Sequence, residues 1–225
     1  MKIQVLGVGG AFSPEIGNSS IILWDKGYKG FLIDCGYTVF PMLKENKLLE
    51  KINRLFITHR HGDHCGSLDT LLYYKKYISK QKIKFYGVSD HLEYLKAIDP
   101  SFEKDFDDYF ENDNTDPITT IPVKHTDSIT SNAFYNYGLL YSGDTSESLL
   151  DSAAARDAKI ILHDVSFNES VNAHTFFNSL ARSADDIKKK TWLYHYNTNE
   201  DVQYESKVAH HGFAGFLKQG QIITF

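Results

Sequence analysis

A short segment near residue 60 holds three histidines and one aspartate. The run THRHGDH, residues 58–64, places His59, His61, Asp63 and His64 side by side in the chain. Neutral imidazole and carboxylate are the usual ligands of zinc and of neighbouring divalent cations. His59 and His61 can point toward one ion, and Asp63 and His64 toward another. The segment therefore predicts ligands for two divalent metal ions.

Two ions need more ligands than this segment supplies. Three further candidates lie at the ends of predicted strands: His125, Asp144 and His195. Taken alone, each has an ordinary explanation, because a strand-end histidine is often structural and Asp144 can cap a following helix. Their order behind the His-rich segment is what makes them metal-ligand candidates.

Alternating and helical apolar patterns predict the elements that position these residues. Predicted strands span residues 2–7, 19–25, 30–36, 54–58, 83–87, 119–126, 159–166, 192–196 and 221–225, with a hairpin at 132–145. Predicted helices span 41–52, 67–80, 89–98, 146–155 and 174–181, with one more helical piece before the last strand. Two strand-rich halves with flanking helices predict an α/β fold of two sheets packed face to face, with helices outside. We expect one domain, residues 1–225.

An acidic stretch, residues 99–116, contains aromatic residues at helical spacing. Phe102, Phe106, Tyr109 and Phe110 are separated by carboxylates. This spacing predicts a helix that packs one aromatic face on the core. A mobile lid and a contact between two copies of the chain are the alternatives.

Composition limits the partners and the compartment. The net charge is −5, with no long basic run, so no stable nucleic-acid partner is expected. The only cysteines are Cys35 and Cys65, which is too few for a secreted disulfide framework. No apolar stretch is long enough to cross a bilayer, and the first residues resemble a strand more than a signal peptide. We therefore expect a cytoplasmic protein that does not associate with a membrane.

The ligand order resembles that of the metallo-β-lactamase superfamily over nearly the whole chain. The resemblance implies an αββα four-layer sandwich with metals bound between the sheet edges. It implies that His59, His61 and His125 hold one ion, that Asp63, His64 and His195 hold the other, and that Asp144 bridges them. Two zinc ions are expected, with manganese as the alternative. Antibiotic-hydrolysing members commonly have cysteine at the bridging position, whereas Asp144 is similar to the phosphodiesterase branches.

Two further segments resemble the ribonuclease Z branch and its small phosphodiesterase relatives. Residues 6–36 resemble the N-terminus of that group. Residues 163–181 resemble its paired motif, in which an acidic residue orients a proton-handling histidine. This resemblance implies catalytic roles for Asp164 and His174, alongside Asp63. The family usually has glutamate where this chain has the shorter Asp164.

Two departures from ribonuclease Z favour a small substrate over tRNA. His125 and Asp144 are separated by only 19 positions, too few for the tRNA-binding arm of those enzymes. The final family motif is altered to LYHYN at residues 193–197. The chain thus resembles small cyclic-nucleotide phosphodiesterases, including the phage anti-Pycsar type. That resemblance implies a homodimer and, for a phage-encoded chain, the host cytoplasm.

The predicted function is hydrolysis of a small phosphodiester, such as a cyclic nucleotide, by a metal-bridging hydroxide, with His174 as the acid. The alternatives are RNA 3′-end processing and a nucleotide-binding relative without catalysis. Five aromatic residues near the motifs are candidates for a base-binding wall, with core packing as the alternative: Phe167, Phe176, Phe177, Tyr194 and Tyr196.

Several other residues match no ligand position in the resemblance. His91, His163, His210 and His211 are expected to be structural or exposed, with His163 as a possible neighbour of the site. Asp34 can orient a ligand imidazole, although an ordinary strand-end carboxylate is equally compatible with its position.

Overall fold

Two β-sheets pack face to face in the computed structural model, which describes residues 1–27, 29–87, 89–111, 118–126 and 128–225. In this described part the first sheet has seven strands, in the order β13-β1-β2-β3-β4-β5-β6. Its strands are β1 (Lys2–Gly7), β2 (Ser20–Trp24), β3 (Gly30–Ile33), β4 (Ile52–Phe56), β5 (Ile83–Gly87), β6 (Phe106–Glu111) and β13 (Ile222–Thr224). Strands β3 to β6 are parallel, whereas β13, β1, β2 and β3 pair antiparallel.

The second sheet has six strands in the described residues, in the order β12-β11-β10-β9-β8-β7. They are β7 (Thr119–Thr126), β8 (Ile129–Asn136), β9 (Leu139–Tyr141), β10 (Ile160–Asp164), β11 (Thr191–Tyr194) and β12 (Gly215–Phe216). Strands β7, β8 and β9 form antiparallel pairs, and β9 to β12 are parallel.

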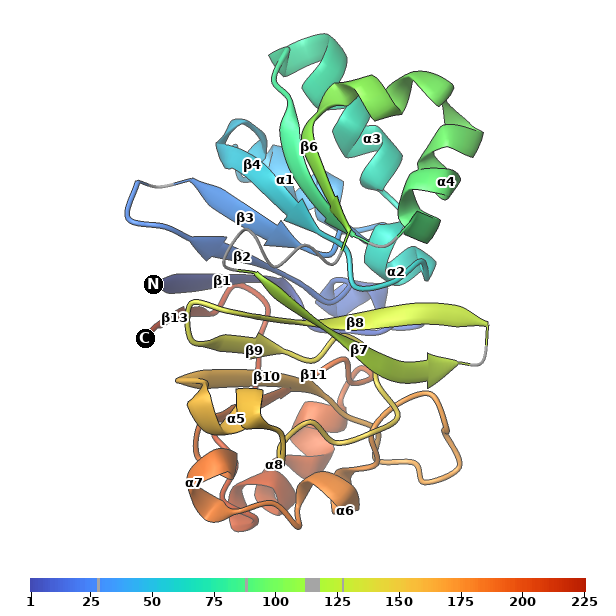
Figure 1. Ribbon diagram of the computed structural model, residues 1–225. Helices are drawn as coiled ribbons and strands as arrows, with labels where there is room; N and C mark the ends of the chain where they lie inside the picture. The colour runs from blue at the N-terminus through green and yellow to red at the C-terminus, as the bar shows by residue number, and fades with distance from the viewer. Residues whose placement is uncertain (28, 88, 112–117, 127) are drawn as a thin grey trace.

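Helices cover the outer faces of both sheets (Figure 1). On the first sheet lie α1 (Val39–Glu45), α3 (Leu68–Tyr73), its π-helical continuation η3 (Tyr74–Ser79) and α4 (Ser89–Ile98). On the second lie α5 (Ala153–Asp157), α6 (Phe177–Leu180), α7 (Asp185–Lys188) and α8 (Glu200–His210). Short helices lie in the connections: η1 (Pro14–Ile16), η2 (Leu49–Lys51), α2 (Gly62–Cys65) and η4 (Pro100–Asp105). The predicted sandwich is confirmed.

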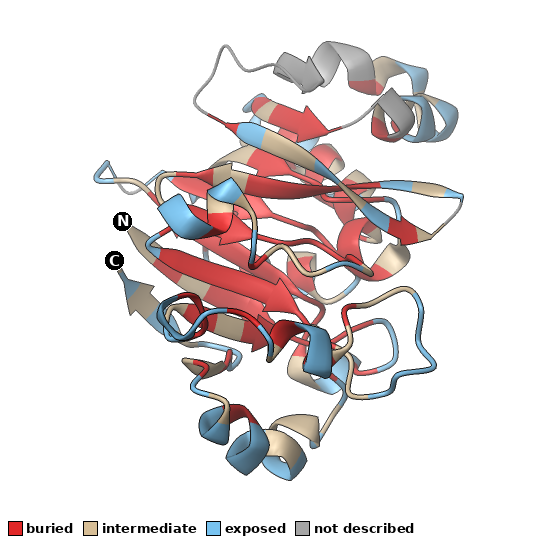
Figure 2. Cartoon of the chain, turned by 60° about the horizontal axis from the view of Figure 1, so that its bottom comes forward, coloured by how far each residue is buried: buried red, intermediate tan, exposed pale blue. Residues whose placement is uncertain are grey.

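The central strands β2 and β3 of the first sheet are buried on both faces because both faces are covered. Successive side chains of a strand point to opposite faces. Ile21 and Leu23 of β2 therefore join the core between the sheets, whereas Ile22 and Trp24 pack under the helices. Figure 2 shows the strands as the buried centre of the molecule.

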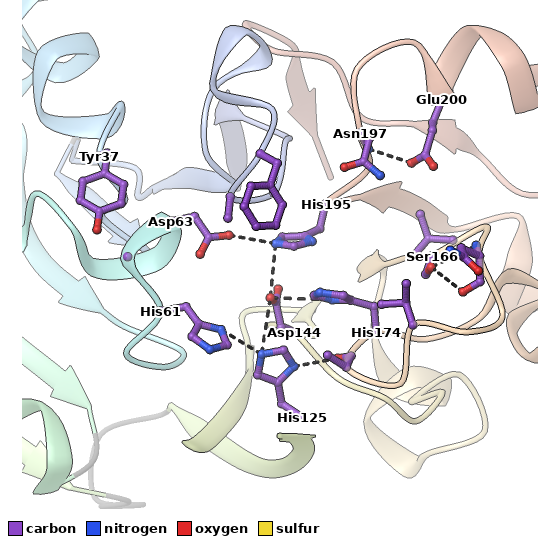
Figure 3. Close-up of a pocket in the computed structure, with 18 residues that line it drawn as sticks. Tyr37, His61, Asp63, His125, Asp144, Ser166, His174, His195, Asn197 and Glu200 are labelled. Atoms are coloured by element: carbon purple, nitrogen blue, oxygen red, sulfur yellow. Dashed lines mark hydrogen bonds and ion pairs between the residues drawn. The ribbon is translucent and has the colours of Figure 1, made fainter. Parts of the chain in front are cut away.

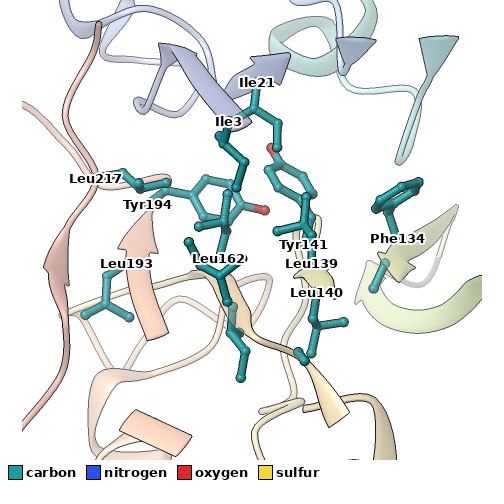
Figure 4. Packing of buried hydrophobic residues seen from close by; sticks show 14 of the residues in the cluster. Ile3, Ile21, Phe134, Leu139, Leu140, Tyr141, Leu162, Leu193, Tyr194 and Leu217 are labelled. Carbon is teal, nitrogen blue, oxygen red and sulfur yellow. The ribbon is translucent and has the colours of Figure 1, made fainter. Parts of the chain in front are cut away.

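Aromatic side chains fill the space between the sheets. Phe134 of β8 contacts Phe31 and Phe56 of the first sheet, with ring centroids 5.3 Å and 5.4 Å apart. Tyr141 and Tyr194 stack on each other at 4.7 Å, and Figure 4 shows Tyr141 pointing toward Ile21 of the first sheet. These contacts fix one sheet against the other, and with them the strand ends.

The predicted helix in the acidic stretch is wrong at residues 106–111. Residues 100–105 form η4, and residues 106–111 form β6, which pairs in parallel with β5. Phe102 is buried, so its part of the aromatic pattern does face the core. Hydrogen bonding to an open sheet edge outweighs the local helical spacing, because aromatic residues also suit strands. Residues 112–116 lie outside the described residues.

Three other predicted helices are shorter in the structure. The helix at 41–52 is reduced to α1 and η2, because β4 begins at Ile52. In the segment 146–155 only α5 is helical, and its N-cap Ser152 accepts a hydrogen bond from the backbone N–H of Ala155 at 3.0 Å. The helix at 174–181 begins only at Phe177, because Phe176 forms a bridge with Ser166. Among the described residues no helix has the length and apolar character needed to span a membrane.

Candidate metal centre

Side chains from both sheets meet at the ends of their strands. His59 and His61 lie in the loop after β4, and Asp63 and His64 lie on α2. From the second sheet come His125 on β7, Asp144 after β9 and His195 directly after β11. Figure 3 shows His61, Asp63, His125, Asp144 and His195 facing a common centre. The structure therefore brings together all seven residues that the sequence predicts as ligands.

The first ligand cluster is made of His59, His61, His125 and Asp144. The Nδ1 atom of His61 lies 2.9 Å from His59 Nε2 and 3.0 Å from His125 Nε2. The Oδ2 atom of Asp144 lies 3.8 Å from His59 Nε2 and 3.9 Å from His125 Nε2. The four ligand atoms lie within 4.8 Å of one another, as donors around one ion would.

The second ligand cluster is made of Asp63, His64, His195 and the same Asp144. His64 Nε2 lies 3.4 Å from Asp63 Oδ2 and 3.3 Å from Asp144 Oδ1. His195 Nε2 lies 3.2 Å from Asp63 Oδ2 and 3.3 Å from Asp144 Oδ2. Asp144 thus belongs to both clusters, one carboxylate between two groups of ligand atoms.

The outer nitrogens of the imidazoles are held by the protein. His64 Nδ1 lies 2.8 Å from Asp34 Oδ2, and His125 Nδ1 lies 2.7 Å from the Ala173 carbonyl oxygen. A neutral imidazole that donates through its outer nitrogen presents a lone pair at the inner one. This arrangement orients the inner nitrogens of both rings toward the clusters. Of the two alternatives for Asp34, its position fits the one in which it orients the imidazole of a candidate ligand.

Two buried atoms at the centre lack a hydrogen-bond partner. Within the described part of the chain, His64 Nε2 and Asp144 Oδ1 make no hydrogen bond. Buried polar atoms are rarely left unpaired, because their desolvation then goes uncompensated. An imidazole nitrogen and a carboxylate oxygen that lie 3.3 Å apart without a hydrogen bond are suited to share a cation. The donor set, imidazole nitrogen and carboxylate oxygen, fits a divalent metal.

The protonation states of five of the candidate ligands also suit metal binding. Burial lowers the pKa of His59, His61 and His125, so these imidazoles stay neutral. Burial alone would raise the pKa of the Asp63 and Asp144 carboxyls, but the neighbouring imidazoles outweigh it and hold both below the ordinary value. Both carboxylates are therefore ionised and able to bind a cation.

Two glycines let the backbone approach residues of the second cluster closely, and so help to position that cluster. A Cβ atom on Gly36 would lie 1.9 Å from the Asp63 carbonyl oxygen, so only glycine admits α2 at this distance. A Cβ atom on Gly10 would lie 2.8 Å from Cε1 of His195. His195 has a φ of 63°, and its backbone N–H donates to the Val8 carbonyl oxygen at 2.7 Å. The loop after β1 therefore sets the position of the His195 ring.

Asp164 and His174 lie in contact, as the resemblance implied. Asp164 ends β10, and its Oδ2 atom lies 3.1 Å from His174 Nδ1, so the shorter carboxylate does reach the ring. The His174 ring stacks on that of His195 with centroids 4.6 Å apart. Burial alone would lower the pKa of His174, but the hydrogen bond to Asp164 and the charge of Asp144 outweigh it and raise this pKa.

The remaining histidines lie outside the two clusters. His163 is buried beside the site: its Nε2 atom accepts from the Leu149 N–H at 3.1 Å, and its Nδ1 atom lies 2.8 Å from the Asp164 carbonyl oxygen. His91 is buried and His210 is exposed. His211 follows the last residue of α8, and Gly212 has a φ of 81°, as expected for a glycine that ends a helix.

A cavity of about 660 Å³ lies over the two clusters. Its floor includes His61, Asp63, His125, Asp144, His174 and His195. Its rim includes the apolar residues Phe12, Tyr37 and Val171 and the polar residues Ser166, Asn168, Asn197 and Glu200. The volume falls in the range of small-molecule sites, roughly 300–1,000 Å³.

None of the five aromatic residues proposed as a base-binding wall lines this cavity. Phe177, Tyr194 and Tyr196 are buried in the core, and Phe167 stacks on Tyr204 at 4.0 Å. Core packing, the alternative for these residues, is what the structure shows for these four.

Two aromatic residues of the rim were not predicted from the sequence. Phe12 and Tyr37 follow glycines in turns, at positions outside any strand or helix periodicity. The sequence signal that could have indicated them is an apolar residue in a turn next to glycine and close to a motif.

The fold matches solved structures of metallo-β-lactamase-fold proteins. YhfI from Bacillus subtilis, described as a metallo-β-lactamase-fold protein, superposes with a TM-score of 0.77 at 20% identity, covering 99% of this chain and 98% of that one. The short form of human tRNase Z gives a TM-score of 0.72 at 19% identity, covering 100% and 99%. These likenesses confirm the predicted fold.

A family model described as "Anti-Pycsar protein Apyc1" matches residues 1–223. The chain belongs to this family. It is 28% identical over 231 residues to the Anti-Pycsar protein Apyc1 of Paenibacillus harenae, covering 93% of this chain and 95% of that protein. It is 29% identical over 272 aligned positions to the Anti-Pycsar protein Apyc1 of Bacillus phage vB_BveM-Goe7, covering 99% and 97%. The predicted resemblance to the anti-Pycsar type is confirmed.

Proposed function

We propose that this chain is a two-metal-dependent phosphodiesterase that hydrolyses a cyclic nucleotide. The observation that carries this proposal is the position of Asp144, which belongs to both ligand clusters at the floor of one cavity. Paired divalent ions are a recurrent solution for phosphodiester hydrolysis. The family name refers to the anti-Pycsar type, and the resemblance to small cyclic-nucleotide phosphodiesterases of that type supports the substrate class.

The seven side chains would hold the ions as the resemblance implied. His59, His61 and His125 would bind one, Asp63, His64 and His195 the other, and Asp144 both. Zinc suits this donor set, with manganese as the alternative. A fold neighbour, PqqB from Methylobacterium extorquens, was solved bound to Zn²⁺; its TM-score is 0.71 at 14% identity. When bound, the ions would lower the pKa of a water molecule and stabilise the phosphodiester oxygens.

His174 would supply the proton that the leaving oxygen needs. Asp164 holds its Nδ1 atom at 3.1 Å, and the ring lines the cavity, so Nε2 is the nitrogen left for a substrate. A carboxylate that fixes an imidazole in this way sets its orientation and favours its protonated form. Asp164 would act through His174 and not on the substrate.

The connection between His125 and Asp144 supports a small substrate. It is occupied by the end of β7, by β8 and by β9. In the described residues of this connection, 125–126 and 128–144, compact antiparallel strands leave no inserted arm that could grip a folded RNA. The cavity combines a polar floor with a mixed rim that includes apolar and aromatic side chains, and with metal ions bound this would suit an anion that carries an aromatic group.

A hydrolysis screen tests the proposal. The protein, loaded with zinc or manganese, is incubated separately with cyclic mononucleotides, cyclic dinucleotides, a simple aryl phosphodiester and a tRNA precursor. We expect turnover of a cyclic nucleotide, its loss in a chelator and its recovery when metal returns. Preferred cleavage of the precursor would support RNA processing instead, and tight nucleotide binding without turnover would support a relative that has lost catalysis.

We also propose that residues 1–225 form one domain and that the protein acts as a homodimer in the cytoplasm, as the resemblance implies. The shared core between the two sheets supports a single domain. Sedimentation in solution tests the assembly, and a monomer at micromolar concentration would contradict it.

A further inference from the structure

Three solvent-exposed apolar side chains lie at the rim of the cavity. Phe12, Tyr37 and Val171 are 94%, 65% and 36% exposed, and all three line the cavity. Single exposed apolar residues are ordinary on protein surfaces, but a group of them around one cavity marks a binding surface. Phe12 is the most exposed of the large apolar residues in the described part of the chain.

Phe12 lies on a turn that is fixed to the metal centre. The hydroxyl of Ser13 accepts a hydrogen bond from the backbone N–H of Thr198 at 3.1 Å. Gly9 forms a bridge with Tyr196, and His195 donates its backbone N–H to Val8. The turn is therefore hydrogen-bonded on both sides of Phe12 to the segment that carries His195. A side chain on such a turn loses little backbone freedom when a ligand binds.

Packing explains Tyr37 but not Phe12. A Cβ atom on Gly62 would lie 2.2 Å from the Tyr37 hydroxyl oxygen, and one on Gly66 would lie 2.3 Å from its ring. Tyr37 thus rests on α2 and supports the loop of Asp63 and His64, and Figure 3 shows it on that side of the cavity. Among the described residues, Phe12 makes no aromatic ring contact, and its side chain is 94% exposed. Its ring is therefore available to a ligand.

We propose that Phe12 stacks on the base of the bound nucleotide and so determines the preference for nucleotides over other phosphodiesters. This inference rests on the proposed function. The ligand clusters select the phosphodiester by charge, whereas an exposed ring at the rim offers a flat face to a flat base. Stacking of one base on an aromatic side chain is worth roughly 5- to 150-fold in affinity.

Two substrates separate base binding from phosphodiester chemistry. One is the cyclic nucleotide found in the screen, and the other is ribose 3′,5′-cyclic phosphate, which has the same phosphodiester but no base. Phe12→Ala is expected to raise KM for the nucleotide about 5-fold or more, with kcat unchanged. KM for the base-free substrate should not change. Phe12→Trp should restore the nucleotide KM, and Phe12→Leu, which is apolar but not aromatic, should not.

Tyr77→Ala is the matched control, because Tyr77 is an aromatic residue 60% exposed on η3 that does not line the cavity. Equal KM values in Phe12→Ala and the unaltered protein would overturn the inference. An equal rise for both substrates, or a change in sedimentation, would also overturn it and assign Phe12 to a contact between copies of the chain.

Calorimetry with a hydrolysis-resistant phosphorothioate nucleotide separates this inference from the proposed function. If the unaltered protein hydrolyses nothing but binds this nucleotide, and Phe12→Ala binds it more weakly, only the proposed function fails. If the unaltered protein hydrolyses the nucleotide and Phe12→Ala shows an unchanged KM, only the inference fails. If the unaltered protein neither hydrolyses nor binds it, both fail.

Discussion

The two ligand clusters share Asp144 but differ in what surrounds them. The first adds three imidazoles, of which His125 is held from behind by a backbone carbonyl. The second adds two imidazoles and the carboxylate of Asp63, and its His64 is held from behind by the carboxylate of Asp34. The second cluster therefore concentrates more negative charge. A carboxylate behind an imidazole also makes the ring a stronger metal ligand than a carbonyl does.

The two proposed ions should therefore respond separately to substitution, except at Asp144, which belongs to both clusters. Changes behind one cluster should weaken one ion, and changes at Asp144 should weaken both. Removal of His174, which binds neither cluster in the proposed assignment, should leave both ions in place.

The largest effect is expected for Asp144→Asn, which removes the shared charge. Groups that hold a ligand from behind typically contribute about 10–100-fold to metal affinity. Loss of a ligand common to both ions should therefore lower metal affinity by more than about 100-fold. Elemental analysis should show less of both metals, and turnover should fall with them. Asp151→Asn, the same change at an exposed position, should have neither effect. Retention of one full equivalent of metal would contradict the sharing.

His174→Ala should separate metal binding from proton transfer. Turnover is expected to fall about 10²–10⁴-fold, the usual contribution of a positioned acid, with metal content unchanged. Steady-state kinetics and elemental analysis of the same preparation check this. His163 lies beside the same Asp164 but is buried, with both ring nitrogens near backbone partners. If His174→Ala loses metal, His174 belongs with the ligands and the proposed assignment is wrong.

Asp34→Asn should weaken the second ion alone. We expect its affinity to fall about 10–100-fold, because the amide no longer supplies a charge to His64. Asparagine is the matched substitution, since Asp34 has a φ of 63° and asparagine tolerates this left-handed conformation. Competition with a metal indicator should resolve two affinities, only one of them changed. A parallel fall in both would show that the clusters are not independent.

Gly10→Ala is expected to have the smallest effect. The added methyl group would lie 2.8 Å from the His195 ring, so the ring must shift while all ligands remain. We expect a loss below about 10-fold in the affinity of the second ion, less than for loss of an outer charge. Gly27→Ala, in an exposed turn, is the control. Unchanged binding would mean that His195 can move without cost.

Much of the candidate site could be predicted because its ligands have local signatures. His59, His61, Asp63 and His64 are close in sequence, so one short pattern names them. His125, Asp144 and His195 could be added because they lie at the ends of predicted strands in a fixed order behind the His-rich segment, although each alone has an ordinary explanation. Asp164 and His174 needed the resemblance, since no spacing rule joins them.

The groups that hold the outer nitrogens of the candidate ligand imidazoles could be predicted less well from the sequence. Asp34 was one of two equal alternatives, and the carbonyl of Ala173 carries no side-chain signal. The strand at 106–111 was predicted as a helix, because its pairing with β5 depends on an open sheet edge elsewhere in the chain. Phe12 and Tyr37 were missed because turns have no periodicity.

The amino-acid sequence alone was enough to predict the chemistry available to this protein: the type and order of the candidate ligands, the strands that carry them and the resulting sandwich. These follow from side-chain identity and from patterns that neighbouring residues set. Only the tertiary structure decided that Asp144 is common to both clusters, that Asp164 reaches His174 and that Phe12 stands at the rim. Such facts depend on distances between segments far apart in the chain, which are fixed by the packing of one sheet against the other.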